Sequence, residues 1–124
     1  MNVNEINALV LAYIGDAAYE LKVRKYLIDM KLGSVNNLQN KSVDYVSANS
    51  QAKILDRLLD MKIFTNEELN TINRAKNHKS VSKPKSASAI SYKKATALEA
   101  LFGMLYLTNR NDRIDEIFRI IVGD

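Results

Sequence analysis

Two stretches of this chain are far more apolar than the rest, and each carries a single charged residue. Residues 6–19 hold only Asp16, and residues 95–109 hold only Glu99. Such runs predict core helices, and an ionised carboxylate in a core is unfavourable unless a positive group meets it. A glycine accompanies each acid: Gly15 directly precedes Asp16, and Gly103 lies one helical turn after Glu99. Two isolated acids of this kind suggest a shared cation.

Apolar residues recur at helical spacing along almost the whole chain. In the first half, the pattern predicts a helix over residues 4–30 that ends at the Leu32-Gly33 stop signal. A short helical turn is expected over residues 35–40, followed by a second long helix over residues 42–61. The inner face of that helix would be formed by Val43, Val46, Ile54, Leu58 and Leu59.

The second half continues the helical pattern after Thr65, which resembles a helix cap because acids follow it in the first turn. That helix should carry Leu69 and Ile72 inward. Residues 80–91 are rich in serine and contain the only proline, which indicates a flexible loop. Helices are then expected over residues 92–108 and 112–122, the latter burying Ile114, Ile117, Phe118 and Ile121. No strand alternation or internal repeat is visible, so the fold should be all-α, a bundle of about five to seven helices.

Composition limits the class of protein. A chain of 124 residues with 47% apolar and 26% charged residues is typical of one globular domain, here residues 1–124. Asp16 and Glu99 interrupt both candidate membrane spans, so no membrane association is expected. The N-terminus lacks a basic leader, which favours a cytoplasmic protein. The absence of cysteine excludes disulfides, thiolate zinc sites and cysteine nucleophiles, and one histidine excludes polyhistidine metal sites.

The net charge of +4 comes from one segment. Residues 74–94 carry seven basic residues and no acid; without those seven, 11 basic residues remain of 18 against 14 acids, a charge of −3. The basic residues are Arg74, Lys76, Lys79, Lys83, Lys85, Lys93 and Lys94. Such a segment favours nucleic acid or another polyanion, and mobile lysines suit the phosphates of duplex RNA. The alternative is a solvated loop whose charge aids solubility.

Antiparallel packing of the two apolar helices would bring Asp16 and Glu99 together. Carboxylate oxygens, completed by water and a substrate phosphate, suit Mg²⁺ or Mn²⁺. Glu20 and Thr96 each lie about one turn away and are candidate outer ligands. Two alternatives stay open at this point. Each acid could be neutralised by a lysine, arginine or backbone group, and Glu20 is better explained as a surface partner of Arg24.

Two motifs resemble those of the ribonuclease III family. Residues 12–20, AlaTyrIleGlyAspAlaAlaTyrGlu, resemble its signature helix, and residues 99–107, GluAlaLeuPheGlyMetLeuTyrLeu, resemble its second motif. Order, separation and helical background agree over essentially the whole chain. A basic loop directly before the second motif, with no double-stranded-RNA-binding domain, resembles the shortened Mini-ribonuclease III branch.

The resemblance implies a homodimeric, Mg²⁺-dependent endonuclease that cuts double-stranded RNA and leaves 5′-phosphates. The substrate it implies is precursor 23S ribosomal RNA. Asp16 and Glu99 take the metal-binding catalytic roles on matching positions. Full-length members carry further acids where this chain has Thr96, Ala12 and Leu9, so water-mediated contacts through Thr96, or help from Glu20, enter the expected site.

The resulting hypothesis is a dimer in which a metal-activated water attacks the phosphodiester and the 3′-oxygen leaves. Lys76, Lys79, Lys83 and Lys85 would grip the duplex, flanked by Arg74, Lys93 and Lys94. The helix of Asp16 is the expected dimer seam because its apolar residues occupy more than one face. The rival hypotheses are a non-catalytic double-stranded RNA-binding protein of the same fold and a small helical protein that docks acidic surfaces.

Overall fold

A computed structural model describes residues 2–78 and 88–123. These residues form six α-helices and one 3-10 turn and contain no strand, which confirms the predicted all-α fold. In chain order, the elements are η1 (Val3–Glu5), α1 (Ala8–Asp29), α2 (Val35–Val46), α3 (Ala48–Asp60), α4 (Asn66–Lys76), α5 (Ala89–Leu107) and α6 (Asn111–Val122). No helix in this described part is long and apolar enough to cross a lipid bilayer.

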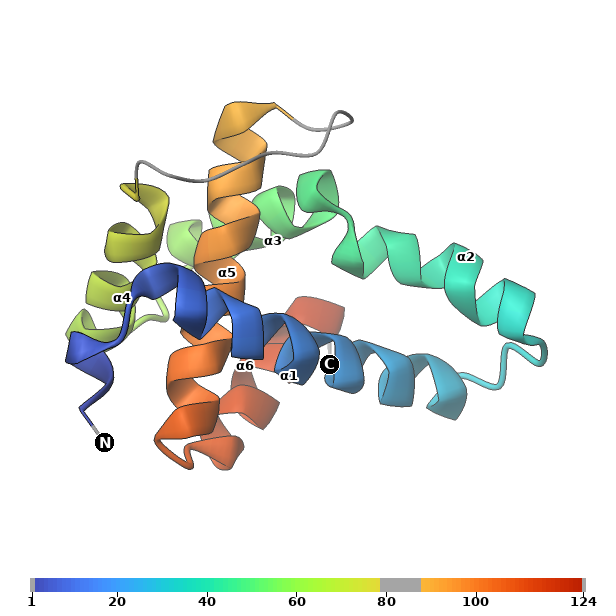
Figure 1. Cartoon of the computed structure of the whole chain (residues 1–124). Helices are drawn as coiled ribbons and strands as arrows, with labels where there is room; N and C mark the ends of the chain where they lie inside the picture. Colours follow the sequence, from blue (N-terminus) through green and yellow to red (C-terminus); the bar gives the residue numbers. More distant parts are fainter. Residues whose placement is uncertain (1, 79–87, 124) are drawn as a thin grey trace.

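The centre of the molecule is the crossing of α1 and α5, the two apolar helices (Figure 1). Glycine allows their backbones to touch. A Cβ atom on Gly15 would overlap the backbone of α5, lying 2.6 Å from the amide nitrogen of Gly103. A Cβ atom on Gly103 would lie 2.8 Å from the carbonyl carbon of Leu11. The helices cross steeply rather than run antiparallel (Figure 1), so the expected packing direction was wrong. At such close approach, backbone contact replaces the side-chain ridges that align helices.

The remaining helices surround this crossing. α3 and α4 pack against α5, while α2 returns beside the second half of α1 and forms with it an arm that extends from the body (Figure 1). An aromatic cluster fixes the base of the arm, where Tyr19 meets Phe102 and Phe118 edge to face. Tyr26 continues the cluster through Phe118 to Tyr45. The four buried residues of α6 are those predicted, Ile114, Ile117, Phe118 and Ile121.

The expected long helix over residues 42–61 is instead two helices that meet at Ser47. Ser47 has an extended backbone, with φ −64° and ψ 152°, and its hydroxyl caps α3 by accepting the Ser50 amide. A serine that bonds backbone groups competes with helix continuation. The break turns Val43 outward, to 53% exposure, so its expected place on the inner face was wrong.

Other helix boundaries differ less from the prediction. The first α-helix starts at Ala8, capped by Asn7, because η1 occupies the preceding residues. Thr65 caps α4 and forms a capping box with Glu68, as its sequence indicated. α5 starts at Ala89, capped by Ser88, so residues 89–91 are helical and not part of a loop. Residues 80–87 of the expected loop lie outside the described part of the chain.

Candidate active site

The α1–α5 crossing brings Asp16 and Glu99 together. Gly15 lies against the backbone of Glu99, and Asp16 is its next residue, so the acid projects beside Glu99 at the edge of the crossing. The two carboxyl groups interact by charge and by a side-chain hydrogen bond. Asp16 is exposed, whereas Glu99 is half-buried. Two acids 83 positions apart in sequence thus share one site, with an open side at Asp16.

This arrangement strongly raises the pKa of the Glu99 carboxyl group. Burial, followed by the nearby charge of Asp16, raises the pKa of Glu99 to about 8. The more distant Glu20 adds to the rise, and a hydrogen bond from Gln51 opposes it. A carboxylate that is hard to ionise beside a second carboxylate is a site where a cation relieves repulsion.

The ion pairs of the described residues leave the two acids without a lysine or arginine partner. Among the ion pairs of the described residues, none involves Asp16 or Glu99, whereas Glu20 pairs with Arg24 at 3.1 Å. The described residues also hold no group of three or more acidic, histidine or cysteine side chains in metal-binding arrangement. In the part of the chain that the structure describes, the two acids therefore have no positive partner, and Glu20 is paired with Arg24 as the i+4 pattern indicated.

Gln51 on α3 completes the surroundings of Glu99 and was missed by the sequence analysis. Its side chain is 2% exposed, and its amide hydrogen-bonds the Glu99 carboxylate. The signal was present in the spacing, since Gln51, Leu55 and Leu58 form the buried face of α3 at i, i+4 and i+7. An amide in such a stripe needs a buried partner.

Thr96 is buried, but its hydroxyl donates to the Tyr92 carbonyl one turn earlier, at 2.9 Å. Nothing in the described part of the chain links Thr96 to Asp16 or Glu99 by a hydrogen bond or a charge interaction. The structure therefore places Thr96 on the helix of Glu99 without joining it to the acid pair.

The basic residues expected to bind RNA have different surroundings. Arg74 donates to the carbonyls of Val3, Asn4 and Ile6, at 3.3, 3.3 and 2.9 Å, and so anchors the N-terminal turn. Lys94 pairs with Asp56 at 3.0 Å. Lys76 and Lys93 are half-buried, and neither forms an ion pair within the described residues. Lys79, Lys83 and Lys85 lie outside the described part.

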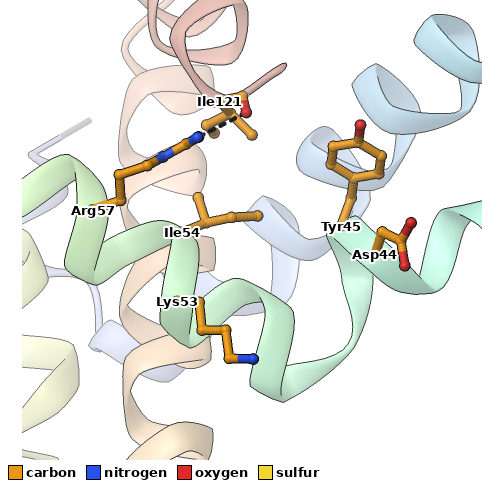
Figure 2. A pocket seen from close by; sticks show the side chains of 6 residues that line it. All are labelled: Asp44, Tyr45, Lys53, Ile54, Arg57 and Ile121. Carbon is orange, nitrogen blue, oxygen red and sulfur yellow. Dashed lines mark hydrogen bonds between the residues drawn. The ribbon is translucent and has the colours of Figure 1, made fainter. Parts of the chain in front are cut away.

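Two surface pockets lined by described residues border α2. One pocket of about 290 Å³ is formed where α2, α3 and α6 meet (Figure 2). There the Arg57 guanidinium donates to the Ile121 carbonyl at 2.7 Å and holds the end of α6. Another hollow, of about 450 Å³, lies between α1 and α2 and includes Glu20 and Arg24. Neither of these two pockets is lined by Asp16 or Glu99.

Comparison with known proteins identifies the family. The family model described as "Ribonuclease III domain" matches residues 9–110, which include both apolar helices and both acids. The chain belongs to the ribonuclease III family.

Similar curated ribonuclease III family members are named Mini-ribonuclease 3. The one from Brevibacillus brevis is 45% identical over 125 residues, covering 98% of this chain and 92% of that protein. The one from Staphylococcus aureus is 38% identical over 117 residues, covering 94% and 87%. A crystal structure of a Fusobacterium nucleatum protein superposes with a TM-score of 0.86 at 31% identity, covering 97% of this chain and 96% of that one. The chain is thus of the Mini-ribonuclease 3 branch and is an endoribonuclease, so the rival interpretation as a non-catalytic RNA-binding protein is set aside.

The acid pair fits the divalent cation that ribonuclease III family members generally require. Carboxylate oxygens are the ligands that Mg²⁺ and Mn²⁺ take in proteins. Mg²⁺ keeps several waters and binds through one or two carboxylates, and this site supplies two. A cation would also remove the repulsion between Asp16 and Glu99 that helps to raise the pKa of Glu99.

Proposed function

We propose that this endoribonuclease cleaves double-stranded RNA with Mg²⁺, or with Mn²⁺ in its place, held by Asp16 and Glu99. The observation that carries the proposal is the meeting of these two acids at the α1–α5 crossing, where Asp16 is exposed and the described residues supply no lysine or arginine partner. The hydrolysis would leave 5′-phosphates. The catalytic domain would comprise residues 1–124.

The two acids would have different tasks because their surroundings differ. Glu99 is held by its half-buried position on α5 and by the Gln51 amide, so it would fix the position of the cation. Asp16 is exposed on α1 and faces solvent, where the scissile phosphate would approach. The cation, when bound, supplies activation of a water molecule and stabilisation of charge on the phosphate. Glu20 and Thr96 would act through intervening water.

We also propose that the active form is a homodimer that pairs through α1. This helix exposes Val10, Tyr13, Leu21 and Ile28, which fall on one face at helical spacing. An exposed apolar stripe of this length on a soluble domain indicates a protein contact. Asp16 borders the same stripe one turn from Tyr13, so pairing there would bring two sites close together. A two-fold dimer would then offer one site to each RNA strand.

The RNA would be bound mainly by the basic segment of residues 74–94. Within it, Lys76, Lys79, Lys83, Lys85 and Lys93 are the proposed phosphate contacts, together with Lys94, which would exchange Asp56 for phosphate. Arg74 would act indirectly, since its guanidinium is occupied by the N-terminal turn. Precursor 23S ribosomal RNA in the cytoplasm is the proposed biological substrate, supported by the likeness to the Mini-ribonuclease 3 proteins.

The proposal is tested with labelled duplex RNA and purified protein, with and without Mg²⁺. We expect cleavage only with the metal, and its loss by at least about 100-fold in Asp16→Asn while RNA binding remains, because the amide is a neutral and weaker cation ligand. Asp29→Asn is the matched control: it makes the same change on the exposed surface of α1, in a pair with Lys25, and should cleave normally. Normal cleavage by Asp16→Asn would remove this residue from the catalytic role.

A further inference from the structure

Gln51 occupies a place where the fold would ordinarily put an apolar residue. It is one of four buried polar or charged residues in the described part of the chain, with Glu68, Thr71 and Thr96. Its neighbours on the buried face of α3 are Leu55 and Leu58, both fully buried. Burying an unpaired amide costs roughly 1–3 kcal/mol in proteins, so the presence of an amide here requires a partner.

That partner is Glu99. The buried Gln51 amide lies on the face of α3 that packs against α5, and it hydrogen-bonds the Glu99 carboxylate. A neutral donor stabilises the carboxylate without the competition that a lysine would offer to a bound cation. One N–H bond also occupies only part of the accepting capacity of a carboxylate, which has about four lone-pair positions.

The position of Gln51 is itself set by the break between α2 and α3 at Ser47. α3 begins at Ala48, capped by Ser47, and Gln51 lies in its first turn. The Tyr19 hydroxyl donates to the Tyr45 carbonyl at 2.7 Å, two residues before the break. Tyr19 is fully buried and lies one turn after Asp16 on α1. A chain of contacts therefore runs from the helix of Asp16, through the break, to the amide that holds Glu99.

We propose that Gln51 is the positioning residue of this site: its amide orients the Glu99 carboxylate and leaves oxygen lone pairs free for the divalent cation. This inference rests on the proposed function of Asp16 and Glu99 as metal ligands. Gln51 acts through Glu99 and contacts neither RNA nor the reacting phosphate. Side chains that orient metal ligands in this way typically contribute about 10- to 100-fold to metal affinity or activity.

Gln51→Met tests the inference because methionine keeps the unbranched shape and removes the donor. Leu55→Met is the matched control, one turn along the same buried face. Four quantities are compared with the wild type: Mn²⁺ affinity by electron paramagnetic resonance, melting temperature, duplex RNA affinity in Ca²⁺, and kcat and KM in Mg²⁺. We expect Gln51→Met to lose about 10- to 100-fold in Mn²⁺ affinity and to show a lower kcat at limiting Mg²⁺. KM and RNA affinity should be unchanged, and Leu55→Met should keep wild-type Mn²⁺ affinity.

A second variant keeps the test decisive if Gln51→Met does not fold. Gln51→Asn retains a buried amide but is one methylene shorter, so it withdraws the donor from Glu99 and should also lose Mn²⁺ affinity. Wild-type Mn²⁺ affinity in the folded Gln51 variants would overturn the inference, as would an equal loss in Leu55→Met. A failure of the proposed function looks different, because the wild type itself would then neither bind Mn²⁺ at Asp16 nor cleave in Mg²⁺.

Discussion

Asp16 and Glu99 carry the same functional group in unequal surroundings. Asp16 is exposed, whereas Glu99 is half-buried among α1, α3 and α5 and has a pKa raised to about 8 by burial and by Asp16. Without metal, Glu99 therefore holds a proton through most of the neutral range. A cation and a proton compete for the same oxygens, which links metal binding to pH.

The raised pKa of Glu99 predicts how the stability of the metal-free protein varies with pH. An unfolded glutamate has a pKa of about 4.3, so between about pH 4.5 and 8 the folded state binds the proton that the unfolded state has released. The free energy of unfolding should therefore fall across this range, by on the order of a few kcal/mol, and level off above it. Glu99→Gln should abolish that part of the slope, measured by urea unfolding in EDTA at a series of pH values.

Glu5→Gln is the control for this measurement, since Glu5 is exposed and remote from the acid pair. It should retain the wild-type slope. Mg²⁺ should flatten the wild-type slope in the upper part of this pH range, because it competes with the proton on Glu99, and should leave the slope of Glu99→Gln unchanged. An unchanged slope in Glu99→Gln would show that Glu99 ionises normally in the folded protein.

The two acids could be predicted from the sequence, and the amide that holds one of them could not. Asp16 and Glu99 are the only charges in two apolar runs, which singles out both residues from hydropathy, although Asp16 is exposed and the helices cross instead of running antiparallel. Gln51 is one polar residue in a mixed segment, and only the true start of α3 shows that it shares a face with Leu55 and Leu58. The roles expected for Lys79, Lys83 and Lys85 remain predictions.

At the scale of the helices, the site depends on how closely α1 and α5 approach. Gly15 and Gly103 let the two backbones meet, and this contact fixes Asp16 beside Glu99. Helix propensity alone would favour alanine at Gly15 by about 1 kcal/mol. The overlap of an added Cβ with the backbone of α5 opposes that gain, because backbone atoms cannot rotate away as a flexible side chain does.

We therefore predict that Gly15→Ala destabilises the protein by at least about 3 kcal/mol, the upper part of the usual range for overpacked cores. Cleavage should fall as well, because the helices must separate and move Asp16 from Glu99. Thermal unfolding and cleavage rates measure both effects. Gly33→Ala is the contrast: no atom lies near its added Cβ, and its φ of +93° alone should cost about 1–2 kcal/mol without loss of cleavage. Equal effects of the two changes would contradict the close crossing.

The break between α2 and α3 shows where helix prediction from pattern fails. Residues 42–61 contain apolar residues at helical spacing and no glycine or proline, so one continuous helix was the natural expectation. The break is made by Ser47, and it is held from outside the segment by the bond of Tyr19 to the Tyr45 carbonyl. A contact between distant parts of the chain does not appear in local periodicity, whereas the cap at Thr65 does because its acids are adjacent.

At the scale of the whole molecule, the positive charge and the exposed apolar stripe belong to different parts of the sequence. The basic segment of residues 74–94 gives the protein its positive charge, while Asp16 and the stripe of Val10, Tyr13, Leu21 and Ile28 share α1. One chain presents one acid pair, and a duplex has two strands. The proposed dimer would supply one acid pair for each strand. A single surface of α1 would suffice for this, because the apolar stripe and Asp16 belong to the same helix.

Leu21→Glu tests this arrangement at the centre of the stripe. Leu21 is 70% exposed, so the change should leave the folded monomer intact while placing two like charges against each other in a two-fold contact. We expect sedimentation to change from dimer to monomer mass at micromolar concentration, an unchanged circular dichroism spectrum, and a fall of at least about tenfold in duplex cleavage. A drop of that size corresponds to about 1.4 kcal/mol or more. Met61→Glu is the control: it also places a glutamate at an exposed apolar residue, here the C-cap of α3, and should remain dimeric and active. If Leu21→Glu keeps the dimer mass, the dimer interface is not formed by this face of α1. If it is a monomer with full activity, each chain cleaves RNA alone.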